Sequence, residues 1–248
     1  MKHQTSIPYY KQVEQYFDRV APRYGIQHGA DMPGGRYGFW ELYKPLLSGH
    51  ILPGMHVLEV GCGNGASTEM LASLNINLTA IDISPQMISV ASQRQPQNTR
   101  FICANVRELE ACGLSPFDII ISFNAFSYFP DKADALGKFR NLLKTGGQLI
   151  ILDMNAMCPL YPIMKVMGKN ELPSWWNVIK CTTPKNLIHL FETTGFQVLE
   201  IRTLNFVPHA TGGFFFEFLK TLNPVLNAIP VLNKLAMRVY IRGLKFAD

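Results

Sequence analysis

The sequence predicts an α/β protein with a doubly wound, mostly parallel sheet. An apolar run of strand type at residues 56–60 ends in three glycines at alternate positions, Gly61, Gly63 and Gly65, and a helix-competent segment follows at once. Further strand-like segments alternate with helix-like segments along the chain. Residues 117–124 are almost continuously apolar, which is typical of a central parallel strand buried on both faces.

Length and composition limit the classes of protein to consider. The 248 residues are 48% hydrophobic, enough for one domain, 1–248, with a large core. The net charge of +5 is modest and Lys and Arg form no long run, so no nucleic-acid partner is expected. The five cysteines are odd in number and lack C-x-x-C spacing. We therefore expect free thiols, no bound metal and a cytoplasmic location.

The N-terminal residues lack an apolar signal region, and no stretch approaches the roughly 20 apolar residues that span a bilayer. Stable membrane insertion is therefore not expected. The expected partner is a small-molecule substrate, and the chain is expected to be a monomer or a homodimer.

The glycine-rich turn at 61–65 indicates a cofactor site. Glycine adopts backbone angles that a Cβ forbids, and it lets a ligand lie against bare backbone. Exposed amide groups at the following helix start add a partial positive charge. The sequence thus predicts a nucleotide-like cofactor at the carboxyl end of the first strand.

The run Glu59-Val-Gly61-Cys-Gly63-Asn-Gly65 resembles motif I of the class I S-adenosylmethionine-dependent methyltransferases. Gly61-x-Gly63-x-x-Ala66 also fits the looser fingerprint of NAD enzymes, with Asp82 at a suitable distance for a ribose contact. The acid two residues before the first glycine favours the methyltransferases. It would sit badly under a pyrophosphate, whereas it suits the ammonium group of a methionine moiety.

The N-terminal residues 1–50 are predicted to form a helical lid. Residues 9–24 carry apolar side chains at helical spacing, and a second helix is expected at 38–47. The pattern from Phe17 to Tyr24 resembles the segment ahead of motif I in quinone-biosynthesis methyltransferases. The resemblance implies that Tyr24 helps to close over the cofactor.

Asp82 ends the second predicted strand, 77–83, and is the second cofactor anchor. Its carboxylate can accept hydrogen bonds from both ribose hydroxyls, while Ser84 is free to cap the helix that starts at Pro85. The family resemblance implies that Ile83 and Met87 flank the adenosine.

The third and fourth predicted strands end at further site residues. Asn105 ends the strand 100–105, where the family commonly has an adenine-binding aspartate, and its side-chain oxygen can accept the same hydrogen bond. Val106 and Asn124 complete the predicted cofactor site. The loop 124–131 occupies the motif IV region, where many small-molecule members carry a histidine and this chain has Tyr128.

The rest of the chain supplies the remaining core elements. We predict a helix at 132–144 ended by Gly146-Gly147, a strand at 148–155, a helix at 183–196 and a strand at 197–204. The family topology implies that a last strand, 237–246, runs antiparallel. The resemblance thus implies a Rossmann-like sheet of seven strands, mostly parallel with one antiparallel strand.

Two insertions, 156–182 and 205–236, exceed this core and are predicted to cap the substrate site. They contain Trp175-Trp176 and Phe214-Phe215-Phe216. Contact with a membrane surface is a second interpretation of the later insertion, which Pro224 and Pro230 are expected to break into short helices.

We therefore predict a methyltransferase that acts on a small, largely apolar or aromatic acceptor. The accepting atom, O, N or C, stays open. His209 and Tyr128 are the candidate catalytic residues, because both are expected near the pocket, whereas His56 and His189 fall in predicted core elements. The alternatives are a non-catalytic S-adenosylmethionine-binding protein and an NAD-dependent oxidoreductase.

Overall fold

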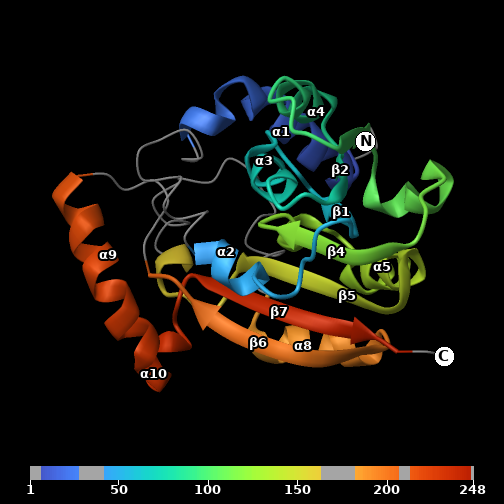
Figure 1. Cartoon of the computed structure of the whole chain (residues 1–248). Coiled ribbons are helices and arrows are strands. Elements are labelled where there is room, and N and C mark those ends of the chain that lie inside the picture. The colour runs from blue at the N-terminus through green and yellow to red at the C-terminus, as the bar shows by residue number, and fades with distance from the viewer. Residues whose placement is uncertain (1–6, 28–41, 163–181, 207–212, 247–248) are drawn as a thin grey trace, which may run out of the picture.

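The computed structural model describes residues 7–27, 42–162, 182–206 and 213–246 (Figure 1). A seven-stranded sheet with the order β3-β2-β1-β4-β5-β7-β6 forms its centre. Only β7 runs antiparallel, to both β5 and β6, which confirms the predicted fold class. The strands are β1 (His56–Val60), β2 (Asn77–Asp82), β3 (Thr99–Cys103), β4 (Phe117–Phe123), β5 (Leu143–Met154), β6 (Phe196–Leu204) and β7 (Arg238–Lys245).

Helices cover both faces of the sheet, as Figure 1 shows. They are α1 (Tyr9–Gln27), α2 (Leu42–Leu47), α3 (Ala66–Ala72), α4 (Pro85–Ser92), η2 (Val106–Cys112), η3 (Phe126–Tyr128), α5 (Lys132–Leu142), α8 (Pro184–Thr193), α9 (Gly213–Ala228) and α10 (Pro230–Asn233).

The core consists of one apolar layer on each face of the sheet. Ile120 of β4 packs in the layer that contains α5 and α8, whereas Ile119 and Ile121 pack in the layer that contains α2 and α3. Alternate residues of a strand point to opposite faces, so a strand covered on both faces is apolar throughout. This arrangement explains the continuous apolar run from which β4 was predicted.

Polar side chains cap three of the described α-helices. Ser84 accepts a hydrogen bond from the Met87 N–H at the start of α4, with Pro85 at the first helical position, as predicted. Thr183 caps α8 in the same way. Asp131 caps α5. These caps determine the residue at which each helix begins after the chain leaves the sheet.

The junction between α5 and β5 was predicted wrongly. The helix ends at Leu142, and Leu143 already pairs with Phe117 of β4. The register then shifts before the main part of the strand, and Gly146 lies at φ +76° within this irregularity. The two glycines therefore serve a bulge inside a long strand, and they do not cap a helix.

Pro224 does not break its helix, contrary to the prediction. It lies inside α9, and the chain is interrupted only before Pro230, which starts α10. One proline removes a single backbone hydrogen bond, which a helix can tolerate with a kink. His56 and His189 lie in β1 and α8, as predicted, and both side chains are exposed.

The second insertion projects from the domain. Figure 1 shows α9 standing apart from the sheet at the left of the view. Asn223 and Asn227 of α9 accept hydrogen bonds from the backbone N–H groups of Phe206 and Asn205, which fastens the helix to the end of β6. Six large apolar side chains are exposed on α9, α10 and their flanks: Phe218, Val225, Ile229, Val231, Leu232 and Leu235.

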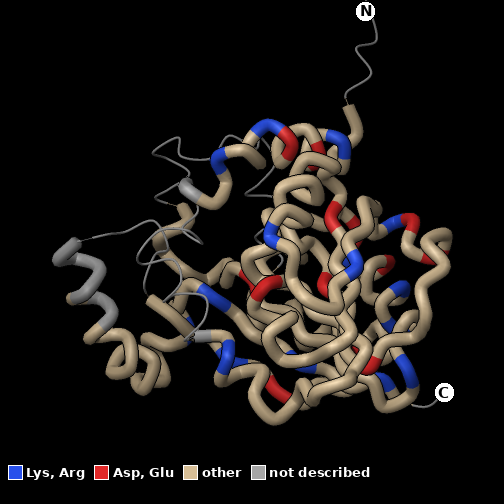
Figure 2. Tube along the Cα trace, turned by 45° about the horizontal axis from the view of Figure 1, so that its top comes forward, with Lys and Arg blue, Asp and Glu red and all other residues tan. Residues whose placement is uncertain are grey.

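Among the described helices, none has the length and apolarity that crossing a bilayer requires. Figure 2 shows Lys and Arg interspersed with Asp and Glu along the described trace. Cys62, Cys103, Cys112 and Cys158 are free thiols.

Candidate active site

The three glycines of the turn after β1 are required for two different reasons beyond their shared backbone conformation. All have positive φ, at +78° for Gly61, +53° for Gly63 and +80° for Gly65. A Cβ at Gly61 would lie 2.2 Å from the Ala125 Cβ, and one at Gly65 would lie 2.9 Å from Ala91. A Cβ at Gly63 would meet nothing within 4 Å. Gly61 and Gly65 therefore serve packing, while the open space beside Gly63 fits a ligand against the backbone.

Asp82 ties the end of β2 to this turn. Its side chain is only 8% exposed, and its Oδ2 accepts a hydrogen bond from the Gly63 N–H at 2.8 Å. Its Oδ1 accepts from the Ser84 N–H at 2.9 Å. Burial raises the pKa of the Asp82 carboxyl, and these two hydrogen bonds oppose the shift. Each oxygen keeps a further lone pair that could accept from a ligand hydroxyl.

Glu59 lies fully buried beneath the same turn. Its carboxylate accepts hydrogen bonds from the hydroxyls of Ser67 and, at 2.6 Å, Thr68, both in α3. Burial raises the pKa of Glu59 to about 7, and the two hydroxyls oppose that shift. The sequence analysis missed Ser67 and Thr68, although two hydroxyl residues in the first turn of the following helix were a visible signal.

Helix α1, the predicted lid, is fastened to the carboxyl edge of the sheet. Asp18 accepts hydrogen bonds from the Ser84 Oγ at 2.5 Å and from the Gln86 N–H at 3.3 Å. The Phe17 ring packs edge-on against Tyr128, with ring centroids 5.2 Å apart. Residues from α1 therefore contact both the turn after β2 and the loop after β4.

Tyr24, predicted to close over the cofactor, lies near Asp82. Burial raises the pKa of the Tyr24 phenol to about 12, and the negative charge of Asp82 adds to this effect. Its ring also contacts Phe17, at 6.1 Å between centroids.

The residues predicted beside the adenosine cluster after β2 and β3. Ile83 is partly buried against the lid, and Met87 is fully buried. The Asn105 side chain accepts from the Arg107 N–H at 3.0 Å and so caps η2, while Val106 packs partly buried against the core. The sequence analysis did not foresee this capping role of Asn105.

Asn124 follows β4 in a left-handed conformation, with φ 53°. Its N–H donates to the Leu152 carbonyl at 2.8 Å. Its Oδ1 is buried and has no hydrogen-bond partner in the described part of the chain. An amide oxygen held without a partner at this edge of the sheet is available to a ligand donor.

Several sequence-predicted residues lie outside the described residues or side chains. They are His209, Trp175 and Trp176, and the side chains of Phe214, Phe215 and Phe216.

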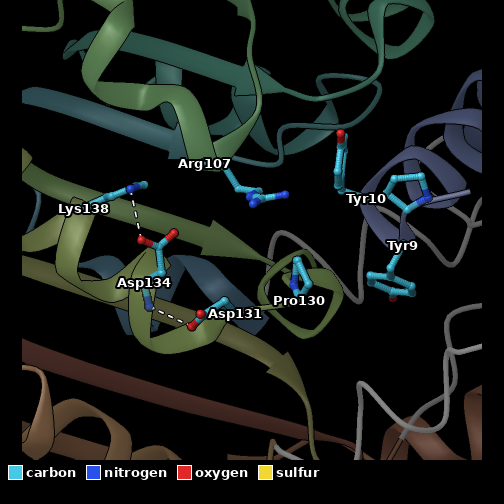
Figure 3. Close-up of a pocket in the computed structure, with 8 residues that line it drawn as sticks. Tyr9, Tyr10, Arg107, Pro130, Asp131, Asp134 and Lys138 are labelled. Atoms are coloured by element: carbon cyan, nitrogen blue, oxygen red, sulfur yellow. Dashed lines mark hydrogen bonds and ion pairs between the residues drawn. The ribbon is translucent and has the colours of Figure 1, made fainter.

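A cavity of about 570 Å³ lies to one side of this edge (Figure 3). Arg107 of η2, whose N–H donates to the predicted cofactor residue Asn105, lines it, whereas none of the turn glycines does. Figure 3 shows Arg107 extending between Tyr10 of α1 and the Asp134–Lys138 pair of α5. The cavity is lined by Pro8, Tyr9, Tyr10, Arg107, Pro130, Asp131, Asp134 and Lys138.

Comparisons with known proteins agree with this geometry. A family described as a methyltransferase domain matches residues 51–195. The ubiquinone biosynthesis O-methyltransferase of Coxiella burnetii is 28% identical over 189 residues, which cover 71% of this chain and 80% of that protein. The enzyme of the same name from Xanthomonas campestris is 33% identical over 107 residues, covering 42% and 45%.

Solved structures share the fold. The cyclase SpnF superposes with a TM-score of 0.69 at 17% identity, covering 97% of this chain and 98% of that one. Magnesium protoporphyrin IX methyltransferase from Synechocystis PCC 6803, with bound S-adenosylhomocysteine, gives 0.65 at 13% identity and covers 96% and 100%. Of the three functions that the sequence left open, these matches select the first. The chain belongs to the methyltransferase domain family and is a class I S-adenosylmethionine-dependent methyltransferase.

Proposed function

We propose that the enzyme transfers the methyl group of S-adenosylmethionine to an oxygen atom of a small, largely apolar or aromatic acceptor. The observation that carries this proposal is an apolar cluster at the carboxyl edge of the sheet. Val13 of α1 packs there with Met154 at the end of β5 and Met237 ahead of β7. Phe17 and Tyr128 pack against it, and so does Ile83.

This cluster lies beside the cofactor residues, since Ile83 directly follows Asp82. An acceptor that enters between α1 and the strand ends would therefore meet aromatic and thioether side chains. Such surroundings favour an apolar ring over a phosphorylated or highly charged molecule, which would need clustered Arg or Lys.

The same edge has a suitable environment for the cofactor. Gly63 leaves room for the methionine moiety, and Asp82 would accept from the ribose hydroxyls. Glu59 would act mainly through Ser67 and Thr68, by fixing the helix start below the turn. The proposed cofactor-binding residues are Tyr24, Glu59, Gly61, Gly63, Gly65, Asp82, Ile83, Met87, Asn105, Val106 and Asn124.

Methyl transfer requires the protein to do little more than align the acceptor with the methyl group. The sulfonium supplies an activated methyl group, so the enzyme has to hold the acceptor oxygen in line with it and to exclude water. The acceptor O–H proton leaves as the new C–O bond forms. Tyr128 lies in the loop after β4 and packs against Phe17 of the lid, and it would orient the acceptor. His209 stays the proposed base.

The choice of oxygen as the accepting atom rests on the sequence relatives. The similar proteins from Coxiella and Xanthomonas are named O-methyltransferases. The more distant N-methyltransferase structure NodS, at 18% identity, shares only the fold.

A panel assay tests this proposal. Release of S-adenosylhomocysteine is measured with phenols, catechols and quinols, with amines of matched size, and with phosphorylated counterparts. We expect turnover with the hydroxylated aromatic compounds and a severalfold or larger loss in Tyr128→Ala, because the ring that packs on the lid is removed. Turnover confined to amines or to phosphorylated acceptors would contradict the proposal.

A further inference from the structure

Arg238 is a buried cation at the carboxyl edge of the sheet, on the side proposed for the acceptor. Arg238 is the first residue of β7 and is 8% exposed. Because β7 is antiparallel, its first residue pairs with Met154, the last residue of β5, and with Leu204, the last of β6. Arg238 therefore lies at the carboxyl edge of the sheet, the edge that carries the glycine turn.

The Arg238 guanidinium has polar neighbours and forms no ion pair within 4 Å among the described residues, although its pKa, which burial lowers, is raised by Tyr161 and by the negative charge of the buried Asp153. Its NH1 group donates to the Tyr161 hydroxyl at 2.8 Å, and that hydroxyl donates to the Met237 carbonyl at 2.7 Å. The Nε–H has no partner in the described part of the chain. Both oxygens of Asp153, a nearby acid, accept backbone N–H groups, those of Ser127 and Met154.

Two further groups connect Arg238 to the reaction site. Tyr43 is fully buried, and Arg238 and Asn124 lie close enough to its phenol to offset part of the rise that burial causes in its pKa. Asn124 is the residue after β4 whose Oδ1 lacks a partner in the described chain. A polar path thus runs from the start of β7 to the mouth of the site.

The position of Arg238 favours the acceptor over the cofactor. Strands β4 and β5 lie between β1, which carries the glycine turn, and β7. With neighbouring strands about 4.8 Å apart, the backbone of β7 lies roughly 14 Å across the sheet from that of β1. This is the side on which an acceptor, rather than the methionine moiety, would lie.

Burying a guanidinium without a direct ion pair is unfavourable, because the hydration lost is not fully replaced. Apolar residues of similar size would often give a more stable protein. We infer that Arg238 forms a subsite for an anionic oxygen, a carboxylate or phenolate, on an aromatic acceptor. This inference rests on the proposed function and adds that one end of an otherwise apolar acceptor is charged. A planar guanidinium binds such an oxygen through charge-assisted hydrogen bonds.

The test uses benzoate and its neutral analogue benzamide as probes of the subsite. Both are titrated into the full-length protein saturated with S-adenosylhomocysteine, and phenolate binding is followed separately with 4-nitrophenol, whose ionised form absorbs at a distinct wavelength. We expect wild-type protein to bind benzoate at least about tenfold more tightly than benzamide. Arg238→Gln should abolish this preference and leave the affinity for S-adenosylhomocysteine unchanged.

Arg242→Gln is the matched control. Arg242 lies on the same strand four residues further along the same face, but it pairs with Glu200 at 3.4 Å and with Gln148 at 3.0 Å. The preference for benzoate should persist in this variant. Thermal unfolding of ligand-free Arg238→Gln supplies a second readout, because loss of a buried charge that forms no direct ion pair with the described residues should not lower the melting temperature.

Three results would overturn the inference. Equal binding of benzoate, benzamide and neutral nitrophenol would remove the anion subsite. A lower melting temperature or failure to fold in Arg238→Gln would assign Arg238 a structural role, and a loss of S-adenosylhomocysteine affinity would assign it to the cofactor. Failure of the proposed function alone would give a different result. The wild-type protein would then bind benzoate selectively and still transfer no methyl group to any hydroxyl.

Discussion

The Gly63 N–H donates a hydrogen bond to Asp82 Oδ2 at 2.8 Å, across 19 residues of sequence. This bond joins the proposed methionine end of the cofactor site to its ribose end. The conformation of the glycine turn and the orientation of the carboxylate are therefore coupled, and a change at either residue should affect binding at both ends.

Asp82→Asn should weaken S-adenosylhomocysteine binding about 10- to 100-fold, the scale of a charge-assisted hydrogen bond. The amide keeps one oxygen and can accept from only one of the Gly63 and Ser84 N–H groups, so the loss combines the charge with one hydrogen bond. Isothermal titration measures the change. Asp118→Asn is the control, because Asp118 also accepts a backbone N–H, from His56 at 2.8 Å, but at the start of β4. Unchanged affinity in Asp82→Asn would remove Asp82 from the site.

Gly63→Ala should lose cofactor affinity, whereas Gly61→Ala should lose stability. An alanine at 63 meets no atom within 4 Å in the ligand-free protein, so it should fold with a cost of about 1 kcal/mol for its positive φ and lose cofactor affinity. An alanine at 61 meets Ala125 at 2.2 Å and should lower the melting temperature markedly. Comparing unfolding midpoint with affinity separates the two, and wild-type affinity in Gly63→Ala would contradict the site.

Glu59 should make ligand-free protein less stable as the pH rises. Its pKa in the folded protein is about 7, above the reference value of 4.5, so the folded state holds a proton that the unfolded state has lost between these values. Stability from this group is full below pH 4.5 and declines through pH 7, by about 3 kcal/mol. Denaturant unfolding at several pH values measures the slope.

Glu59→Gln is the comparison variant for that slope. Asp82 and Asp153 also have raised pKa values and contribute in the same direction, so the difference between wild type and variant reports Glu59 alone. Identical slopes in both proteins would show that Glu59 does not titrate in this range.

Asp18→Asn should loosen the lid. Asp18 holds α1 to Ser84 and Gln86, so its loss should speed dissociation of S-adenosylhomocysteine severalfold with little effect on global stability. Stopped-flow displacement measures this rate. Glu14→Gln on the same helix, where Glu14 pairs only locally with Lys11, should dissociate the ligand at the wild-type rate. A lid that plays no part in retention would give equal rates in all three proteins.

Local patterns were sufficient to predict much of this fold. The glycine turn, the aspartate at the end of β2 and the Ser84 cap could be predicted because each depends on residues close in sequence. The predictions failed where distant residues decide the outcome. Pairing of Leu143 with Phe117 extends β5 backward, and Ala125, 64 residues after Gly61, explains why that glycine is needed.

The polar cluster around Arg238 shows the same limit. Tyr161 lies 77 residues before Arg238, and no periodicity relates them. The antiparallel insertion of β7 between β5 and β6 brings the cation to the carboxyl edge of the sheet. An arginine within an apolar strand was visible in the sequence, but its place at this edge required the sheet order.

The central claim is that this edge of the sheet directs methyl transfer to an oxygen of an apolar aromatic acceptor. The most direct measurement follows ¹³C-labelled methyl from S-adenosylmethionine into product by NMR, with Asp82→Asn in parallel. The account predicts an O-linked methyl resonance that appears in step with S-adenosylhomocysteine and is strongly slowed at subsaturating cofactor in the variant. Label on nitrogen or carbon, or label transfer that Asp82→Asn leaves unchanged, would contradict it.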